Sequence, residues 1–77
     1  MIIDPAGEVA PYLQLAAILR GMIESGELAP GARLPSIIDL AETYGVARTT
    51  AHKALRVLVD EQLAVVSKGR GMFVKRT

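Results

Sequence analysis

The sequence predicts a mainly α-helical domain that ends in a small β-hairpin. In three separate segments, apolar residues recur at intervals of three and four, the spacing that places them on one face of a helix. Residues 63–77 instead hold short apolar runs on either side of a glycine-flanked tip, the pattern of a hairpin. With 77 residues and no cysteine, the chain has room for one domain, without disulfides or thiolate metal sites.

The first helix is expected to begin at Pro11, because proline suits the first helical turn, and to end before Gly26. Its apolar face comprises Tyr12, Leu15, Ala16, Leu19, Met22 and Ile23. Residues 1–10 show no such periodicity, so we expect a flexible N-terminal arm there and a folded domain over residues 11–77.

The segment after the first helix, ELAPGARLPS, holds two prolines and a glycine. It therefore predicts a turn, with room for a very short strand around Arg33 and Leu34. Ser36 has the position of an N-cap for a short second helix over residues 39–44, which ends at Gly45.

A third helix is expected over residues 47–61, and its buried stripe is formed by Ala51, Ala54, Leu55 and Leu58. The remaining residues predict a hairpin with a first strand at Val65 and Val66, a turn at residues 68–71 and a returning strand at residues 72–74. The order of helix, short strand, two helices joined by a tight turn, and hairpin is that of a winged helix-turn-helix, with three helices plus a wing.

The exposed side of the third helix gathers cationic and hydrogen-bonding groups. At helical spacing, one face is shared by Arg48, Thr49, His52, Lys53 and Arg56. Residues 1–30 carry one basic residue against four acidic ones, a net charge of −3, whereas residues 31–77 carry eight against four, a net charge of +4. A domain polarised in this way can present a basic face to a polyanion.

These residue types suit duplex DNA. A helix fits the major groove, where side chains near its N-terminus reach base edges and nearby amides and cations hold phosphates. Arg48 can donate two parallel hydrogen bonds to guanine, while Thr49 and Thr50 can bond phosphate or touch a thymine methyl, and His52 can do either. The two glycines at the hairpin tip let its backbone approach a groove wall closely.

Three segments carry a resemblance to a known family: PYLQLAAILRGMIESGELAPGARLPS, then DLAETYGVARTTAHKALRVL, then GRGMFV. In this order they resemble the DNA-binding domain of GntR-type bacterial transcriptional repressors, over about residues 11–75. The resemblance implies that the Arg-Thr-Thr run opening the third helix contacts DNA and that the basic and glycine residues of the wing insert at the minor groove. These positions are Arg48, Thr49, Thr50, Lys68, Gly69 and Arg70.

The chain departs from that family's pattern at several places. Ile37 and Ile38 stand where the family usually has a glutamate and a second polar or basic residue, which weakens the case for DNA contacts from the second helix. His52 replaces a common arginine, and Ala47 replaces a Ser or Thr cap, a change that typically costs ~1 kcal/mol. Family members normally continue into an effector-binding or dimerising domain.

The leading prediction is a sequence-specific regulator of transcription that binds double-stranded DNA in the bacterial cytoplasm, most simply a repressor. Helix 47–61 would read the major groove and the wing, residues 67–72, would touch the minor groove. The predicted operator has two inverted half-sites, which a homodimer would occupy. The expected DNA-binding residues are Arg33, Ser36, Arg48, Thr49, Thr50, His52, Lys53, Arg56, Lys68, Gly69 and Arg70.

Other functions are not expected. The single histidine has no cysteine or carboxylate cluster beside it, and no Ser-His-acid arrangement or phosphate-cradling loop occurs, so no enzyme, metal or cofactor is predicted. The longest apolar runs are far shorter than the ~20 residues of a membrane span. No small-molecule effector is predicted for this chain.

Several alternatives stay open. Winged helices also serve as protein-interaction modules, and an apolar patch around Ile37 and Ile38 favours that function. Dimers could form through these isoleucines and Leu13, or only on DNA, or through parts of a longer protein. Surface charge or local backbone bonding is an alternative role for Arg33, Thr49, Thr50, Lys53 and Arg56.

Overall fold

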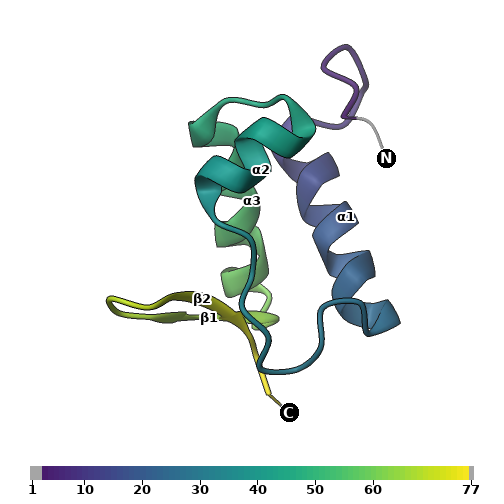
Figure 1. The fold of residues 1–77 in the computed structure, drawn as a ribbon. Helices are drawn as coiled ribbons and strands as arrows, with labels where there is room; N and C mark the ends of the chain where they lie inside the picture. The colour runs from purple at the N-terminus through teal and green to yellow at the C-terminus, as the bar shows by residue number, and fades with distance from the viewer. Residues whose placement is uncertain (1–2, 77) are drawn as a thin grey trace.

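The computed structural model describes residues 3–76, in which three helices precede a two-stranded sheet (Figure 1). The elements are α1 (Pro11–Ser25), α2 (Ile37–Tyr44), α3 (Arg48–Asp60), β1 (Ala64–Ser67) and β2 (Gly71–Val74). This is the predicted winged helix-turn-helix, in which α2 and α3 are joined by a short turn and the antiparallel strands form the wing. Within the described residues, no helix is long and apolar enough to cross a membrane.

Local chemistry sets the ends of α1 and α2. Pro11 lies in the first turn of α1, and Gly26 ends this helix with a left-handed backbone, φ 86°. The hydroxyl oxygen of Ser36 accepts a hydrogen bond from the Asp39 amide at 3.1 Å, which confirms the predicted N-cap of α2. The predicted start of this helix at residue 39 is two residues too late, because the residues directly after the cap already form its first turn.

The bounds of α3 and of the wing strands also differ slightly from the prediction. Ala47 and Glu61, expected inside the third helix, are its two caps. Ser67 pairs with Gly71, so both strands reach further toward the tip than predicted and the connecting turn is shorter. The hairpin itself is confirmed.

One hydrophobic core joins the helices to the wing. The largest fully buried side chains are Leu15, Leu19, Leu40 and Leu58. The predicted stripe of α3 is confirmed, since all four of its members are at most 2% exposed. Its two alanines and Ala16 of α1 are fully buried, which lets helix backbones pack closely and leaves the opposite side of α3 to solvent.

The segment between α1 and α2 ties the wing to the helices. Arg33 forms an antiparallel bridge with Phe73, and the Leu34 amide donates to the Met72 carbonyl at 2.9 Å. The predicted very short strand is confirmed as this bridge. β2 therefore lies between β1 and residues 32–34, and the hairpin projects from this pairing beyond the helices (Figure 1).

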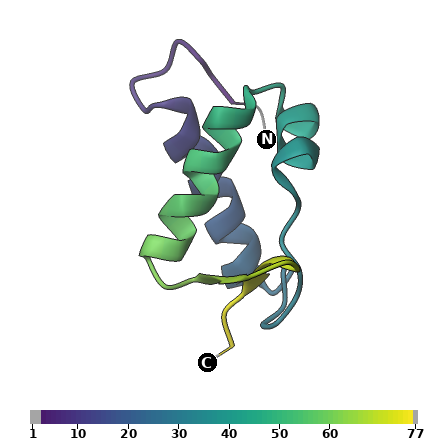
Figure 2. The ribbon, with the colours of Figure 1, turned by 90° about the vertical axis from the view of Figure 1, so that its left-hand side faces the viewer.

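Residues 3–10 fold back onto the helices. Ile3 is only 7% exposed, and the side chain of Gln14 accepts a hydrogen bond from the Asp4 amide at 2.8 Å and donates one to the Asp4 carbonyl at 2.7 Å. Figure 2 shows this segment looping over the start of α1 toward the turn between α2 and α3. The flexibility expected for residues 1–10 stays a prediction, and residues 1 and 2 lie outside the described part of the chain.

Candidate nucleic-acid interface

The solvent-facing side of α3 carries the polar set that the sequence places there. All five members are exposed: Arg48, Thr49, His52, Lys53 and Arg56. Thr50, by contrast, is half-buried. The sharp turn before this helix depends on Gly45, whose left-handed φ of 65° ends α2 and lets α3 start in a new direction three residues later.

The N-terminus of α3 presents backbone amides without a side-chain partner. Ala47 has the extended backbone of a cap residue, φ −65° and ψ 153°, but its methyl side chain accepts no hydrogen bond. The first-turn amides of a helix have no acceptor inside the helix itself. Together with the helix dipole, they can hold an anionic phosphate oxygen. The alanine cap therefore costs stability and leaves these donors free.

Two of the cations on α3 have partners. The Lys53 ammonium lies 5.7 Å from the centre of the Tyr12 ring on α1, a cation–π contact that holds it at the side of the helix. Arg56 and Asp60 lie 4.0 Å apart, and both are well exposed, so their pair contributes little stability. Arg48 makes no ion pair within residues 3–76, and its guanidinium keeps all its donors for another molecule.

The wing tip places a second group of cations beyond the helices. Lys68, Gly69 and Arg70 are all exposed, and the turn is closed by the Arg70 amide, which donates to the Ser67 carbonyl at 2.9 Å. Gly69 has φ 78°, a conformation that costs other residues ~1–2 kcal/mol. The tip thus combines two free cations with a backbone that a partner can approach.

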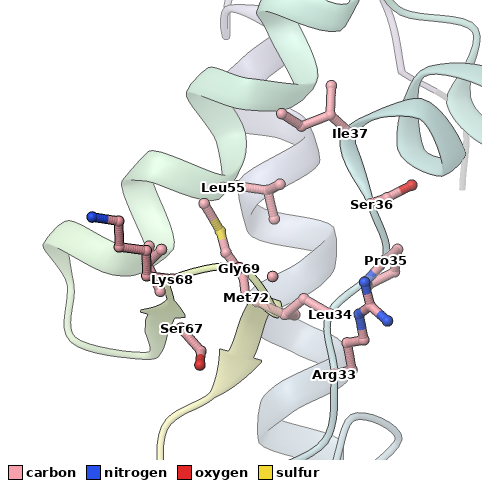
Figure 3. Close-up of a pocket in the computed structure, with 12 residues that line it drawn as sticks. Arg33, Leu34, Pro35, Ser36, Ile37, Leu55, Ser67, Lys68, Gly69 and Met72 are labelled. Carbon is pink, nitrogen blue, oxygen red and sulfur yellow. The ribbon is translucent and has the colours of Figure 1, made fainter.

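A groove of about 460 Å³ separates the wing from the start of α2 (Figure 3). Its floor is apolar and includes Leu55 and Met72, while Arg33 and Lys68 lie on opposite sides of it. Ser36 also lines it, although its hydroxyl oxygen already accepts the capping hydrogen bond. The groove thus brings predicted residues from the loop before α2 next to the wing.

The two adjacent isoleucines behave differently. Ile37 is half-buried, packs against the core, and points toward α3 (Figure 3). Ile38 is 49% exposed. The apolar surface available to the protein-interaction alternative therefore comes mainly from Ile38, and that alternative stays a prediction.

At the C-terminal end of α3 the charged side chains are paired. Arg20 of α1 donates two hydrogen bonds to the carboxylate of Glu61, at 2.8 and 2.9 Å, so both charges are neutralised locally. In the described residues no ion pair involves Arg33, Arg48, Lys68 or Arg70. Unpaired positive charge is thus present around the start of α3 and the wing, and the paired charge lies at the opposite end of α3.

Two residues that lie at or beside the candidate interface are not among the predicted DNA-binding residues. Ser67 lines the groove beside Lys68, and its signal in the sequence is a single hydroxyl in an otherwise apolar strand next to a basic tip. Tyr12 is predicted only as part of the apolar face of the first helix, and its ring also makes the cation–π contact with Lys53. That contact depends on how α1 and α3 pack, which the sequence pattern does not specify.

Comparison with known proteins relates this chain to transcription factors. Residues 11–74 match the family described as "Bacterial regulatory proteins, gntR family". The chain is 40% identical over 76 residues to the HTH-type transcriptional repressor NagR of Bacillus subtilis, covering 99% of this chain and 31% of that protein. It is 42% identical over 64 residues to the repressor MngR of Escherichia coli, covering 83% of this chain and 27% of that protein. The chain thus spans less than a third of either relative.

Solved structures show the same likeness. YtrA from Sulfolobus acidocaldarius, a GntR-family transcription factor, superposes with a TM-score of 0.89 and 43% identity, covering 97% of this chain and 79% of that one. The DNA-binding domain of AraR in complex with an operator superposes with a TM-score of 0.85 and 29% identity, covering 96% of this chain and 92% of that one. NagR, MngR and YtrA are named as transcription regulators rather than enzymes.

Proposed function

The chain belongs to the gntR family of bacterial regulatory proteins, and from this premise we propose that it binds operator DNA sequence-specifically and acts as a transcriptional repressor. The observation that carries the proposal is the unpaired, exposed cationic surface formed by the start of α3 and the wing tip. The likeness to a DNA-binding domain solved with its operator supports it.

In this proposal α3 enters the major groove with its N-terminus leading. Arg48 donates two hydrogen bonds to guanine O6 and N7, since no carboxylate of the described chain pairs with it. Thr49 and the first-turn amides bond phosphate, and the half-buried Thr50 adds its hydroxyl from the edge of this surface. His52 contacts a base edge or a phosphate one turn further along.

The remaining predicted residues position the domain. Lys53 and Arg56 contact DNA phosphates beside α3. Arg33 and Ser36 contact the sugar-phosphate backbone of the DNA where it passes over the protein groove between the wing and α2. Lys68, Gly69 and Arg70 approach the minor groove, where their charge adds affinity for any sequence. These assignments divide the surface into one base-reading part and two phosphate-holding parts.

Two copies are proposed to occupy inverted half-sites about one helical turn, or ~34 Å, apart. The domain measures 35 × 26 × 20 Å, so this spacing requires one of the two shorter dimensions of each copy to lie along the duplex. A single module of this size binds weakly, and pairing on DNA raises occupancy. The site of action is the cytoplasm, at the bacterial nucleoid.

The expectation that no small-molecule effector binds this chain stays a prediction. Thermal melting of the chain with candidate metabolites, in the absence of DNA, checks it. A raised melting temperature with any of them would contradict it, because a ligand that binds only the folded state stabilises that state.

The function is tested by titrating the chain into a fluorescent duplex from upstream of its own gene and into a scrambled duplex, over a range of salt concentrations. We expect the native duplex to be preferred by about 100-fold or more, with a salt dependence that indicates several released ions. Equal or undetectable binding to both would contradict the proposal.

A further inference from the structure

A second, shallower depression lies between the start of α2 and the exposed face of α3. It has a volume of about 430 Å³ and is lined by Ile37, Arg48, Thr49, His52 and Lys53. Its walls are mainly apolar although four of these five residues are polar. The apolar surface comes from Ile37, from the threonine methyl group and from the hydrocarbon stems of the cationic residues.

Ile37 is the only fully apolar side chain in this set, and its position is well defined. It lies in the first turn of α2, is half-buried against the core, and points toward α3 (Figure 3). A β-branched side chain in a helix has one strongly preferred χ1 rotamer, which fixes the position of its γ-methyl group. Ile38 has the same side chain and greater exposure, 49%, but it does not line the depression.

We propose that Ile37 contacts the 5-methyl group of a thymine in the major groove and so selects thymine at one position of each half-site. This inference rests on the proposed function. The depression lies on the surface that we assign to base reading, and polar groups that can bond bases or phosphates surround it. Among the four DNA bases, only thymine presents an apolar group in the major groove.

The same contact disfavours the other bases. A cytosine would place its N4 amino group near this surface, and a polar group that loses water without gaining a partner is penalised. Uracil differs from thymine only by lacking the methyl group. Burial of one methyl group corresponds to about a fourfold difference in affinity, which is therefore the expected preference for thymine over uracil.

The experiment begins by selecting preferred duplexes for this chain from a randomised library, then replaces each thymine singly with deoxyuridine. Fluorescence anisotropy gives the affinity ratio between the thymine and uracil duplexes. We expect one thymine in each half-site at which the ratio is about four, and ratios near one at the other thymines. A scan with no such position overturns the inference.

Variants assign the contact to a side chain. Ile37→Ala should bring the ratio at that thymine to about one, whereas the matched control Ile38→Ala should leave it at about four. The ratio compares two duplexes on the same variant, so a general loss of affinity does not change it. Circular dichroism checks folding, and Ile37→Val, which removes a single methyl group, should give an intermediate ratio if Ile37→Ala does not fold.

Three further outcomes are decisive. If Thr49→Ser abolishes the preference while the Ile37 variants keep it, the threonine methyl makes the contact and the inference is overturned. If the selection yields no preferred sequence, the proposed function fails and the inference fails with it. A preferred sequence without any thymine-over-uracil effect leaves the proposed function standing and removes only the role of Ile37.

Discussion

The start of α3 and the wing tip both carry cations of the proposed DNA-binding surface, but the fold holds the two groups differently. α3 presents Arg48 from a helix whose other side is almost completely buried against α1 and α2. The wing presents Lys68 and Arg70 from a short turn beyond the core, where every residue is exposed. A side chain must be held in a fixed position to form two parallel bonds to a base, whereas charge attraction to phosphate tolerates movement. This difference supports the proposal that α3 selects bases and that the wing adds general affinity.

The largest expected effect is a loss of stability when a buried side chain of α3 is truncated. Leu58 is fully buried, so Leu58→Ala should lower the free energy of unfolding by ~2–5 kcal/mol, a large part of the stability of so small a domain. Val66→Ala in the wing, where valine is 57% exposed, should change it by less than ~0.5 kcal/mol. Urea denaturation followed by circular dichroism measures both. Similar losses in the two variants would show that the exposed Val66 stabilises the fold as much as the buried Leu58.

The next largest effect is on DNA affinity, and it should differ between a cation of α3 and a cation of the wing. Arg48→Ala should cost ~1–3 kcal/mol of binding to the preferred duplex and relax the preference at one base pair. Lys68→Ala should weaken binding to preferred and scrambled duplexes alike and lower the salt slope by about one. Anisotropy titrations at several salt concentrations distinguish these patterns. Equal losses on every sequence for both variants would contradict base reading by Arg48.

A smaller effect concerns the uncapped start of α3. Ala47 has the backbone of a cap residue without an accepting side chain, so Ala47→Thr should raise the free energy of unfolding by ~1 kcal/mol and the melting temperature by ~4–8 °C. Ala47→Val has nearly the same shape but no hydroxyl, and it serves as the control. A gain from valine equal to that from threonine would show that packing, not capping, stabilises the variant.

The smallest effect should come from the end of α3 that lies away from the proposed DNA surface. The side chains of Arg20 and Glu61 are 34% and 42% exposed, so water screens their pair and Arg20→Gln should cost less than ~1 kcal/mol of stability. That cost should shrink in high salt. Binding to the preferred duplex should stay within about twofold of the unsubstituted chain, because neither residue lies on the proposed interface. A larger loss of binding would extend the interface to this end.

The sequence predicts most of the fold because helical spacing and caps are local properties. The stripe of α3, the Ser36 cap and the glycine ends of α1 and α2 all follow from residues close together in the chain. The start of α2 was placed too late because two consecutive isoleucines have no helical period. Gly71 was assigned to the turn because glycine favours turns, but it pairs with Ser67.

The site was predictable as a set of residue types but not as an arrangement. Charge and spacing identify the exposed residues of α3 and the wing. The contact of Lys53 with Tyr12 and the different environments of Ile37 and Ile38 depend instead on how separate helices pack. The DNA-binding role of each side chain stays a prediction, which the variants above test at Arg48 and Lys68.

The bridge between Arg33 and Phe73 has a consequence for how the chain folds during synthesis. It joins two segments separated by α2, α3 and β1, so it forms only after nearly all of the domain has left the ribosome. Until then the backbone of residues 32–34 lacks its partner strand. We expect the helices to pair first and the wing to close last, as the step that shields this segment from aggregation.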